Sequence, residues 1–203
     1  MNFELAIMAI FLSLMILYVF AAIYSGRLHK PWPMKRTILW LVGMMCAALT
    51  FAGPIAERSH TDFTAHMVGH LLLGMAAPLL LVLASPMTLI LRCLPVNSAR
   101  ILVRLLKGFP FSWLTHPIVA SILNIGGLWL LYRTELFILM HHHPLIYYLV
   151  HVHVFAAGYL FTASMIYFDP TPYRYSFIYR TVVFIFALTG HGILSKLIYA
   201  HPP

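Results

Sequence analysis

The stretch TAHMVGHLLLGMAAP, residues 64–78, places His66 and His70 four residues apart at the start of a long apolar run. Residues four apart share one face of an α-helix, and the same face continues with Gly74 and Ala77. Small residues of this kind let membrane helices approach one another closely. We therefore expect a buried helix whose two imidazoles point toward protein and not toward lipid.

The whole chain has the composition of an integral membrane protein. Of its 203 residues, 62% are hydrophobic and 9% are charged, whereas soluble domains carry about 25% charged residues. A helix needs about 20 apolar residues to cross the bilayer core. We predict an all-α integral membrane helical bundle, a single domain over residues 1–203. Its six expected transmembrane helices lie near residues 3–24, 37–56, 64–91, 117–137, 145–167 and 177–200.

Positive charge is unevenly divided between alternate loops. Ten of the 13 basic residues fall on one side: Arg27, Lys30, Lys35, Arg36, Arg92, Arg100, Arg104, Lys107, Arg174 and Arg180. The positive-inside rule makes this side cytoplasmic, so we expect both termini outside. The net charge of +8 then reflects orientation in the lipid bilayer, and nucleic acid is not expected as a partner.

Three further features fit this picture. The first apolar segment has no preceding basic region and is long for a cleaved signal, so we expect a retained helix. Residues 95–113 alternate basic and apolar side chains, which is typical of a helix lying on the cytoplasmic face. Cys46 and Cys93 lack the spacing of a disulfide framework or a zinc knuckle, and we interpret them as buried small residues.

Histidines lie at a similar depth in three of the expected helices. At 1.5 Å per residue, His70, His153 and His191 are each about 12 to 13 Å below the outer end of their helix. His66 lies on the same helix face as His70. A single intramembrane histidine is often only a hydrogen-bonding link between helices, but several at one depth favour a shared site.

One helix carries two of these histidines. His151 and His153 lie about 200° apart around it, so they cannot both point to the same centre. We expect His153 to be the inward residue because it shares its face with Ala156, Ala157 and Ser164. The participation of His151 is left open.

Neutral imidazole is the commonest metal ligand, and a bound metal offsets the cost of burying several imidazoles. The predicted metal ligands are listed here: His66, His70, His153, His191 and His151. Imidazole suits both copper and zinc, and copper stands highest in the affinity order of the first-row divalent ions. Cu(I) prefers sulfur ligands, however, and no methionine or cysteine shares the histidine faces.

Further histidines lie in the expected outer loops and could collect metal ions: His60, His141, His142 and His143. Met140 precedes the last three as a soft extra ligand. A chance run of histidines in a polar loop explains the same residues equally well.

The stretch HMVGHLLLGMAAPLLLVLASP (66–86) resembles the signature helix of the bacterial cytochrome c oxidase assembly factors of the CtaG type, as found in Gram-positive bacteria. The similarity continues in HVHVFAAGYLF (151–161), DP (169–170) and HGILSKLIYA (191–200). The resemblance implies a multi-pass protein of the bacterial cytoplasmic membrane that is not an enzyme. It also implies handling of copper at the outer face for cytochrome c oxidase subunits. A homodimer is left open.

Two other functions remain compatible with the histidines. In one, they ligate haem between helices and the protein transfers electrons, which predicts a Soret band. In the other, they relay protons or move a metal across the bilayer. A transport path needs polar groups in the inner half of the membrane, and there the sequence offers Asn124, Thr162 and Ser164.

Overall fold

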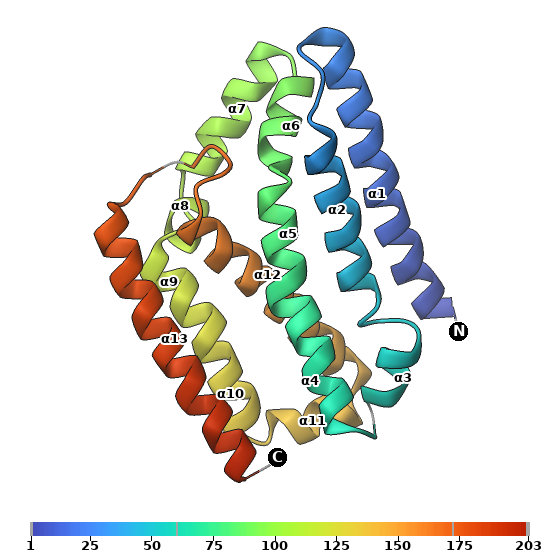
Figure 1. The fold of residues 1–203 in the computed structure, drawn as a ribbon, viewed down its shortest axis with the longest axis vertical. Coiled ribbons are helices and arrows are strands. Elements are labelled where there is room, and N and C mark those ends of the chain that lie inside the picture. The colour runs from blue at the N-terminus through green and yellow to red at the C-terminus, as the bar shows by residue number, and fades with distance from the viewer. Residues whose placement is uncertain (1, 60, 172, 202–203) are drawn as a thin grey trace.

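The computed structural model describes residues 2–59, 61–171 and 173–201. Within these ranges every regular element is a helix, so the all-α prediction is confirmed. Figure 1 shows two groups of helices beside a central column, with one further helix crossing behind.

The first group consists of α1 (Asn2–Leu28) and α2 (Met34–Ala48), which run side by side in opposite directions (Figure 1). Pro33 precedes α2 with an extended backbone, as expected because proline fixes its φ angle and cannot continue a preceding helix. The Tyr18 ring of α1 stacks on Trp40 of α2 at 4.5 Å between centroids. The Tyr18 hydroxyl also donates a hydrogen bond to the Ala84 carbonyl at 2.7 Å, which ties this pair to the central column.

The central column contains the stretch with the paired histidines. Three segments form one continuous helix: α4 (Phe63–Leu71), η1 (Leu72–Ala76) and α5 (Ala77–Leu83). The middle segment is a π-helical turn, in which the Ala77 N–H bonds the Leu72 carbonyl five residues back. Asp62 caps the start of α4 by accepting a hydrogen bond from the Thr64 N–H at 2.8 Å.

A second helix is built in the same way. It joins α9 (Pro117–Ser121), the π-helical η2 (Ile122–Gly126) and α10 (Gly127–Arg133). The chain then bends by 78° into α11 (Leu136–His142).

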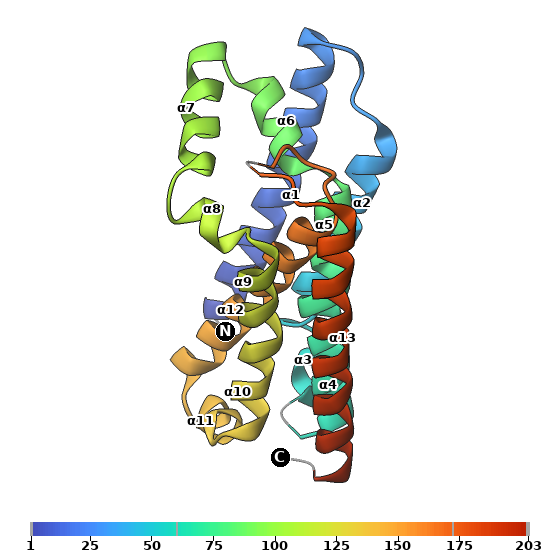
Figure 2. The ribbon, with the colours of Figure 1, turned by 90° about the vertical axis from the view of Figure 1, so that its left-hand side faces the viewer.

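Two long helices complete the bundle, α12 (Pro144–Met165) and α13 (Phe177–Ala200). Helix α12 contacts both η1 and η2 and therefore lies between the two π-helical turns (Figures 1 and 2). Helix α13 packs mainly on α9, η2 and α12. The position of α12 decides which of its histidines meets which neighbour.

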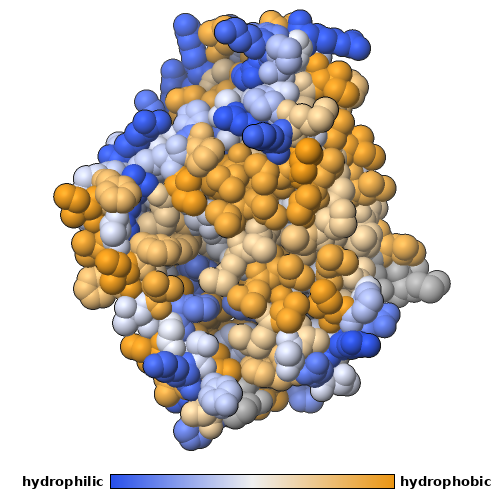
Figure 3. Space-filling view, viewed as in Figure 1, coloured by the Kyte–Doolittle hydropathy of each residue, from blue (hydrophilic) through white to orange (hydrophobic). Residues whose placement is uncertain are grey.

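The remaining helices are short or peripheral: α3 (Pro54–Ser59), α6 (Pro86–Cys93), α7 (Val96–Lys107) and α8 (Phe111–Leu114). Helix α7 has no buried residue and carries Arg100, Arg104 and Lys107 beside exposed Ile101 and Leu105. This is the arrangement of a helix lying on a membrane surface. Figure 3 shows a broad apolar band across the molecule with hydrophilic groups gathered at both ends.

Four helices of the described part are long and apolar enough to cross a membrane: Leu5–Leu28, Phe63–Leu83, Pro144–Met165 and Phe177–Ala200. The bent pair Pro117–Arg133 and Leu136–His142 is a fifth candidate. Six spans were expected. The segment 37–56 instead gives the 15-residue α2, followed by a turn in which Gly53 has a φ of 94°. The expected 64–91 helix breaks after Leu83, because Ser85 adopts a left-handed φ of 55°.

The DP pair at 169–170 has a structural role. The Asp169 carboxylate accepts hydrogen bonds from the Met87 N–H at 3.1 Å and from the Thr88 N–H at 2.8 Å. It accepts a third from the Thr88 hydroxyl at 2.6 Å. The first N–H groups of a helix have no partner within the helix, so Asp169 satisfies this end of α6 from the loop between α12 and α13.

Replacing Asp169 by asparagine is expected to destabilise the protein by about 1.5 to 3 kcal/mol, the usual range for hydrogen bonds to a charged group. Thr88→Val removes only the hydroxyl bond and should cost about 1 kcal/mol. The midpoint of thermal unfolding of each purified variant in detergent measures the effect. Equal midpoints for Asp169→Asn and wild type would show that this cap is dispensable.

Candidate functional site

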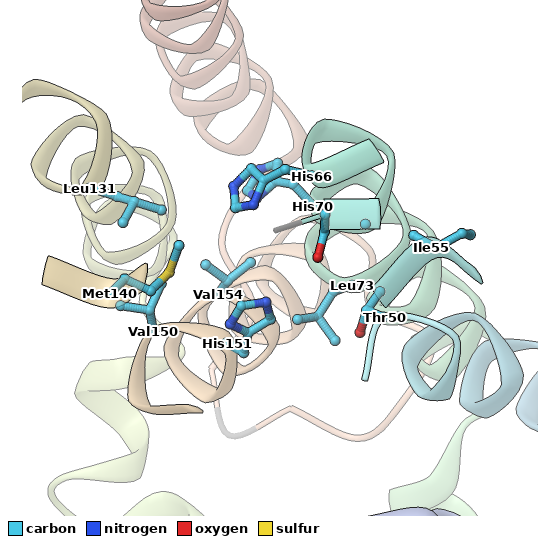
Figure 4. Close-up of a pocket in the computed structure, with 12 residues that line it drawn as sticks. Thr50, Ile55, His66, His70, Leu73, Leu131, Met140, Val150, His151 and Val154 are labelled. Carbon is cyan, nitrogen blue, oxygen red and sulfur yellow. The ribbon is translucent and has the colours of Figure 1, made fainter. Parts of the chain in front are cut away.

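A small cavity lies between α4, α11 and α12 at the end of the bundle where both termini lie (Figures 1 and 4). Its volume is about 20 Å³, and one water molecule needs roughly 10 to 15 Å³. The cavity therefore has room for a single water or a single metal ion. Its lining includes three imidazoles, one thioether and two hydroxyls: His66, His70, His151, Met140, Thr50 and Ser59.

The first two imidazoles come from one face of α4, as the spacing in the sequence predicts. His66 is 8% exposed, and its Nε2 lies 3.0 Å from the hydroxyl oxygen of Tyr132 in α10. The His70 ring meets the same Tyr132 ring edge-on at 6.3 Å between centroids. Tyr132 therefore holds this face of α4 against α10.

The π-helical turn after His70 lets α12 pack closely. A Cβ atom on Gly74 would lie 2.9 Å from Val154 Cγ1 and 3.6 Å from His70 Cε1. A Cβ on Gly158 would overlap the Gly74 carbonyl oxygen. Val154 and Gly158 lie three and seven residues after His151, on its helix face. The contact that fits α12 against η1 therefore also turns His151 toward the cavity.

His151 is oriented by its own helix. Its Nδ1 lies 2.8 Å from the Tyr147 carbonyl oxygen. A carbonyl only accepts hydrogen bonds, so Nδ1 carries the proton and Nε2 carries the lone pair. Metal-binding histidines usually donate their second ring nitrogen in this way, which fixes the ring and raises its basicity.

His153 lies elsewhere, which differs from the expectation that it is the inward residue of this helix. It is exposed, and its Nε2 lies 3.1 Å from the Leu123 carbonyl oxygen in η2. A Cβ on Gly127 would overlap the His153 ring. Because α12 lies between two π-helical turns, its histidines meet different neighbours: His151 faces η1 and His153 faces η2.

Met140 is a member of the cavity that the sequence placed in an outer loop. It belongs to α11, is 1% exposed and lines the cavity beside His66 and His151 (Figure 4). The 78° bend before α11 folds this helix back over the bundle. The bend therefore places a thioether beside the imidazoles of the cavity.

His191, another of the predicted ligands, belongs to α13. It does not line the small cavity but borders a larger groove, and its Nδ1 is buried with no hydrogen-bond partner among the described residues.

A second hollow of about 340 Å³ lies next to the small cavity and shares Ser59 and His66 with it. It is lined by Asp62, His141 and His142, and His66 borders both spaces. His141 donates from Nδ1 to the Phe137 carbonyl at 2.8 Å, and its ring centroid lies 6.0 Å from that of His66. His143 is exposed and does not line either hollow, and His60 lies outside the described residues.

Among the described residues, no three His, Cys, Asp or Glu side chains are close enough to hold a metal ion together. The three imidazoles and the Met140 thioether nevertheless line the same cavity. Cys46 and Cys93 are unpaired and do not line the cavity, and a cysteine ligand is therefore not part of the donor set.

Comparison with known proteins gives three curated relatives of moderate similarity. Uncharacterized proteins of Mycobacterium bovis (Mb0105) and Mycobacterium tuberculosis (MT0111) are each 34% identical over 157 residues, or 73% of this chain. The Mycobacterium leprae protein ML1998 is 31% identical over 187 residues, or 88% of the chain. The chain spans only 23 to 28% of the length of these relatives.

No solved structure matches the chain significantly. The model of the cytochrome c oxidase caa3 assembly factor family matches residues 16–203, which include both π-helical turns and every histidine of the small cavity. The family predicted from the paired-histidine stretch is thus confirmed. This chain belongs to the cytochrome c oxidase caa3 assembly factor family, Caa3_CtaG.

Proposed function

We propose that the protein binds one copper ion in the small cavity and supports its insertion into cytochrome c oxidase. The observation that carries the proposal is the convergence of His66, His70, His151 and Met140, from three helices, on a cavity of about 20 Å³. Copper is the cargo of this step. The protein needs to bind and release it, and no covalent step is involved.

The donor set favours copper over the other candidates. Imidazole binds both copper and zinc, but a thioether is a soft ligand that selects Cu(I). Haem requires far more space, since pockets for organic ligands measure about 300 to 1,000 Å³. The small cavity therefore suits a lone ion, and Met140 supplies the sulfur that Cu(I) prefers.

The position of the cavity supports delivery from the outer face. Most of the basic residues lie in the end of α1, the start of α2, the loop between them and helices α6 and α7, which are at the opposite end of the bundle (Figure 1). By the positive-inside rule that end is cytoplasmic and the cavity end is external. Copper would enter through the hollow at His141 and His142 and pass His66 to reach His70 and His151.

The experiment is complementation of a bacterial strain that lacks this protein. Wild type should restore the copper content of purified cytochrome c oxidase, whereas His70→Ala should leave the oxidase short of copper with its haem content unchanged. His70 is chosen because its imidazole lines the cavity. Equal copper in the oxidase from both strains, with equal amounts of assembly protein in the membrane, would contradict the proposal.

A further inference from the structure

A larger groove opens on the flank of the bundle between α13 and the central helix α4–η1–α5 (Figure 3). Its floor is formed by η2 and α12. The volume is about 520 Å³, within the range of about 300 to 1,000 Å³ for organic ligands. Because α13 and the central helix are both candidate spans, the groove faces the hydrocarbon region of a bilayer.

The groove is chemically asymmetric. Most of its lining is apolar, for example Leu79, Phe161 and Phe184. Its only charged lining residue in the described part of the chain is Arg180, in the first turns of α13. A cavity of this kind suits an amphiphile with one anionic group and an apolar tail.

The part of the groove beyond Arg180 is about as long as one leaflet. Along α13 the groove extends from Phe177 to His191, and the part beyond Arg180 spans 11 residues (191 − 180). At 1.5 Å per residue this is about 16 Å, close to half of the bilayer core of about 30 Å. Arg180 lies in the first turns of α13, at the end that the positive-inside rule makes cytoplasmic.

Arg180 is held in place by its surroundings. One Nη1–H donates to the Met165 carbonyl, and the guanidinium lies 4.3 Å from the centroid of the Tyr167 ring. Its buried Nε has no hydrogen-bond partner among the described residues. A guanidinium has five N–H donors in a planar fork that fits phosphate oxygens. The Arg180 side chain is thus held in position and keeps further N–H donors for a phosphate group.

We propose that this groove binds one anionic phospholipid of the inner leaflet. The phosphate pairs with Arg180, and one acyl chain lies along α13 toward His191. The lipid closes the open flank between α13 and the central helix. The proposal does not depend on copper binding, because the groove and the small cavity have no lining residue in common.

The test is native mass spectrometry of the purified full chain in detergent, titrated with phosphatidylglycerol or phosphatidylcholine. Wild type should retain one phosphatidylglycerol with an affinity about tenfold above that for phosphatidylcholine, because both lipids carry the phosphate but the choline cation of phosphatidylcholine opposes the charge of Arg180. Arg180→Gln should abolish this preference. Arg100→Gln removes the same charge from α7, outside the groove, and should leave the preference intact.

A second variant tests the tail without altering charge. Leu188 lines the groove and is 59% exposed, so Leu188→Trp fills the space without burying new bulk in the core. It should weaken binding of both lipids and leave copper binding unchanged. An unaltered phosphatidylglycerol preference in folded Arg180→Gln, or unaltered lipid binding in Leu188→Trp, would overturn the proposal, as would competition by inorganic phosphate alone. If Arg180→Gln does not fold, Leu188→Trp decides.

Discussion

Replacing His151 by alanine is expected to lower the affinity of the purified protein for Cu(I) by about 100-fold or more, because loss of even an outer-shell partner costs about 10- to 100-fold. The imidazole of His151 lines the small cavity and is oriented by the Tyr147 carbonyl. Its removal leaves two imidazoles and one thioether to hold the ion.

The matched control is His153→Ala, two residues along the same helix. His153 faces η2 and bonds the Leu123 carbonyl, so its loss should change copper affinity by less than about threefold, well under the 10-fold lower bound for outer-shell effects. Competition with a chromophoric Cu(I) chelator measures both affinities. If His153→Ala binds Cu(I) more weakly than His151→Ala does, then α12 presents His153 to the copper ion, as the sequence pattern favours.

Gly158→Ala is expected to destabilise the protein by about 3 kcal/mol, at the upper end of the usual cost of overpacking. The new Cβ would overlap the Gly74 carbonyl oxygen and lie 3.2 Å from Pro78 Cγ. These atoms belong to a helix backbone and a proline ring, which cannot move aside cheaply. Helix α12 must shift away from η1, and His151 shifts with it.

Gly192→Ala on α13 is the control, since a Cβ there meets nothing within 4 Å. Alanine is favoured over glycine in a helix by about 1 kcal/mol, so this variant should unfold at the wild-type temperature or above it. Thermal unfolding in detergent, followed by circular dichroism, compares the two. A Gly158→Ala protein as stable as Gly192→Ala would mean that α12 does not pack tightly on the π-helical turn.

The fold class and the paired-histidine helix could be predicted because they depend on composition and on helical spacing. His66 and His70 share a face wherever a helix forms, so they reach the cavity as expected. The span boundaries were harder to predict. The break at Ser85 depends on a single left-handed residue, which hydropathy does not reveal.

The choice between His151 and His153 could not be made from the sequence. Both lie on faces that also carry small buried residues, Gly158 for the first and Ala157 for the second. What separates them is the close contact of Gly158 with Gly74 in η1, and a π-helical turn leaves no clear pattern in an apolar run. The only indication in the sequence of this close helix contact was the pair of glycines at 74 and 158.

Met140 was assigned to a loop because it falls between the expected spans 117–137 and 145–167. In the structure residues 136–142 form α11, and the bend after Arg133 turns Met140 into the core. Such a bend is set by packing between distant segments. The DP pair was likewise visible as a motif, yet its role in capping α6 required the contact between Asp169 and Thr88.

The central claim is that one copper ion is bound by histidine and methionine in the small cavity. X-ray absorption spectroscopy of the protein loaded with one equivalent of Cu(I) tests it most directly. The account predicts two or three nitrogen scatterers and one sulfur scatterer, with the sulfur signal lost in Met140→Leu. A copper environment without sulfur, or one that is unchanged in both Met140→Leu and His151→Ala, would contradict it.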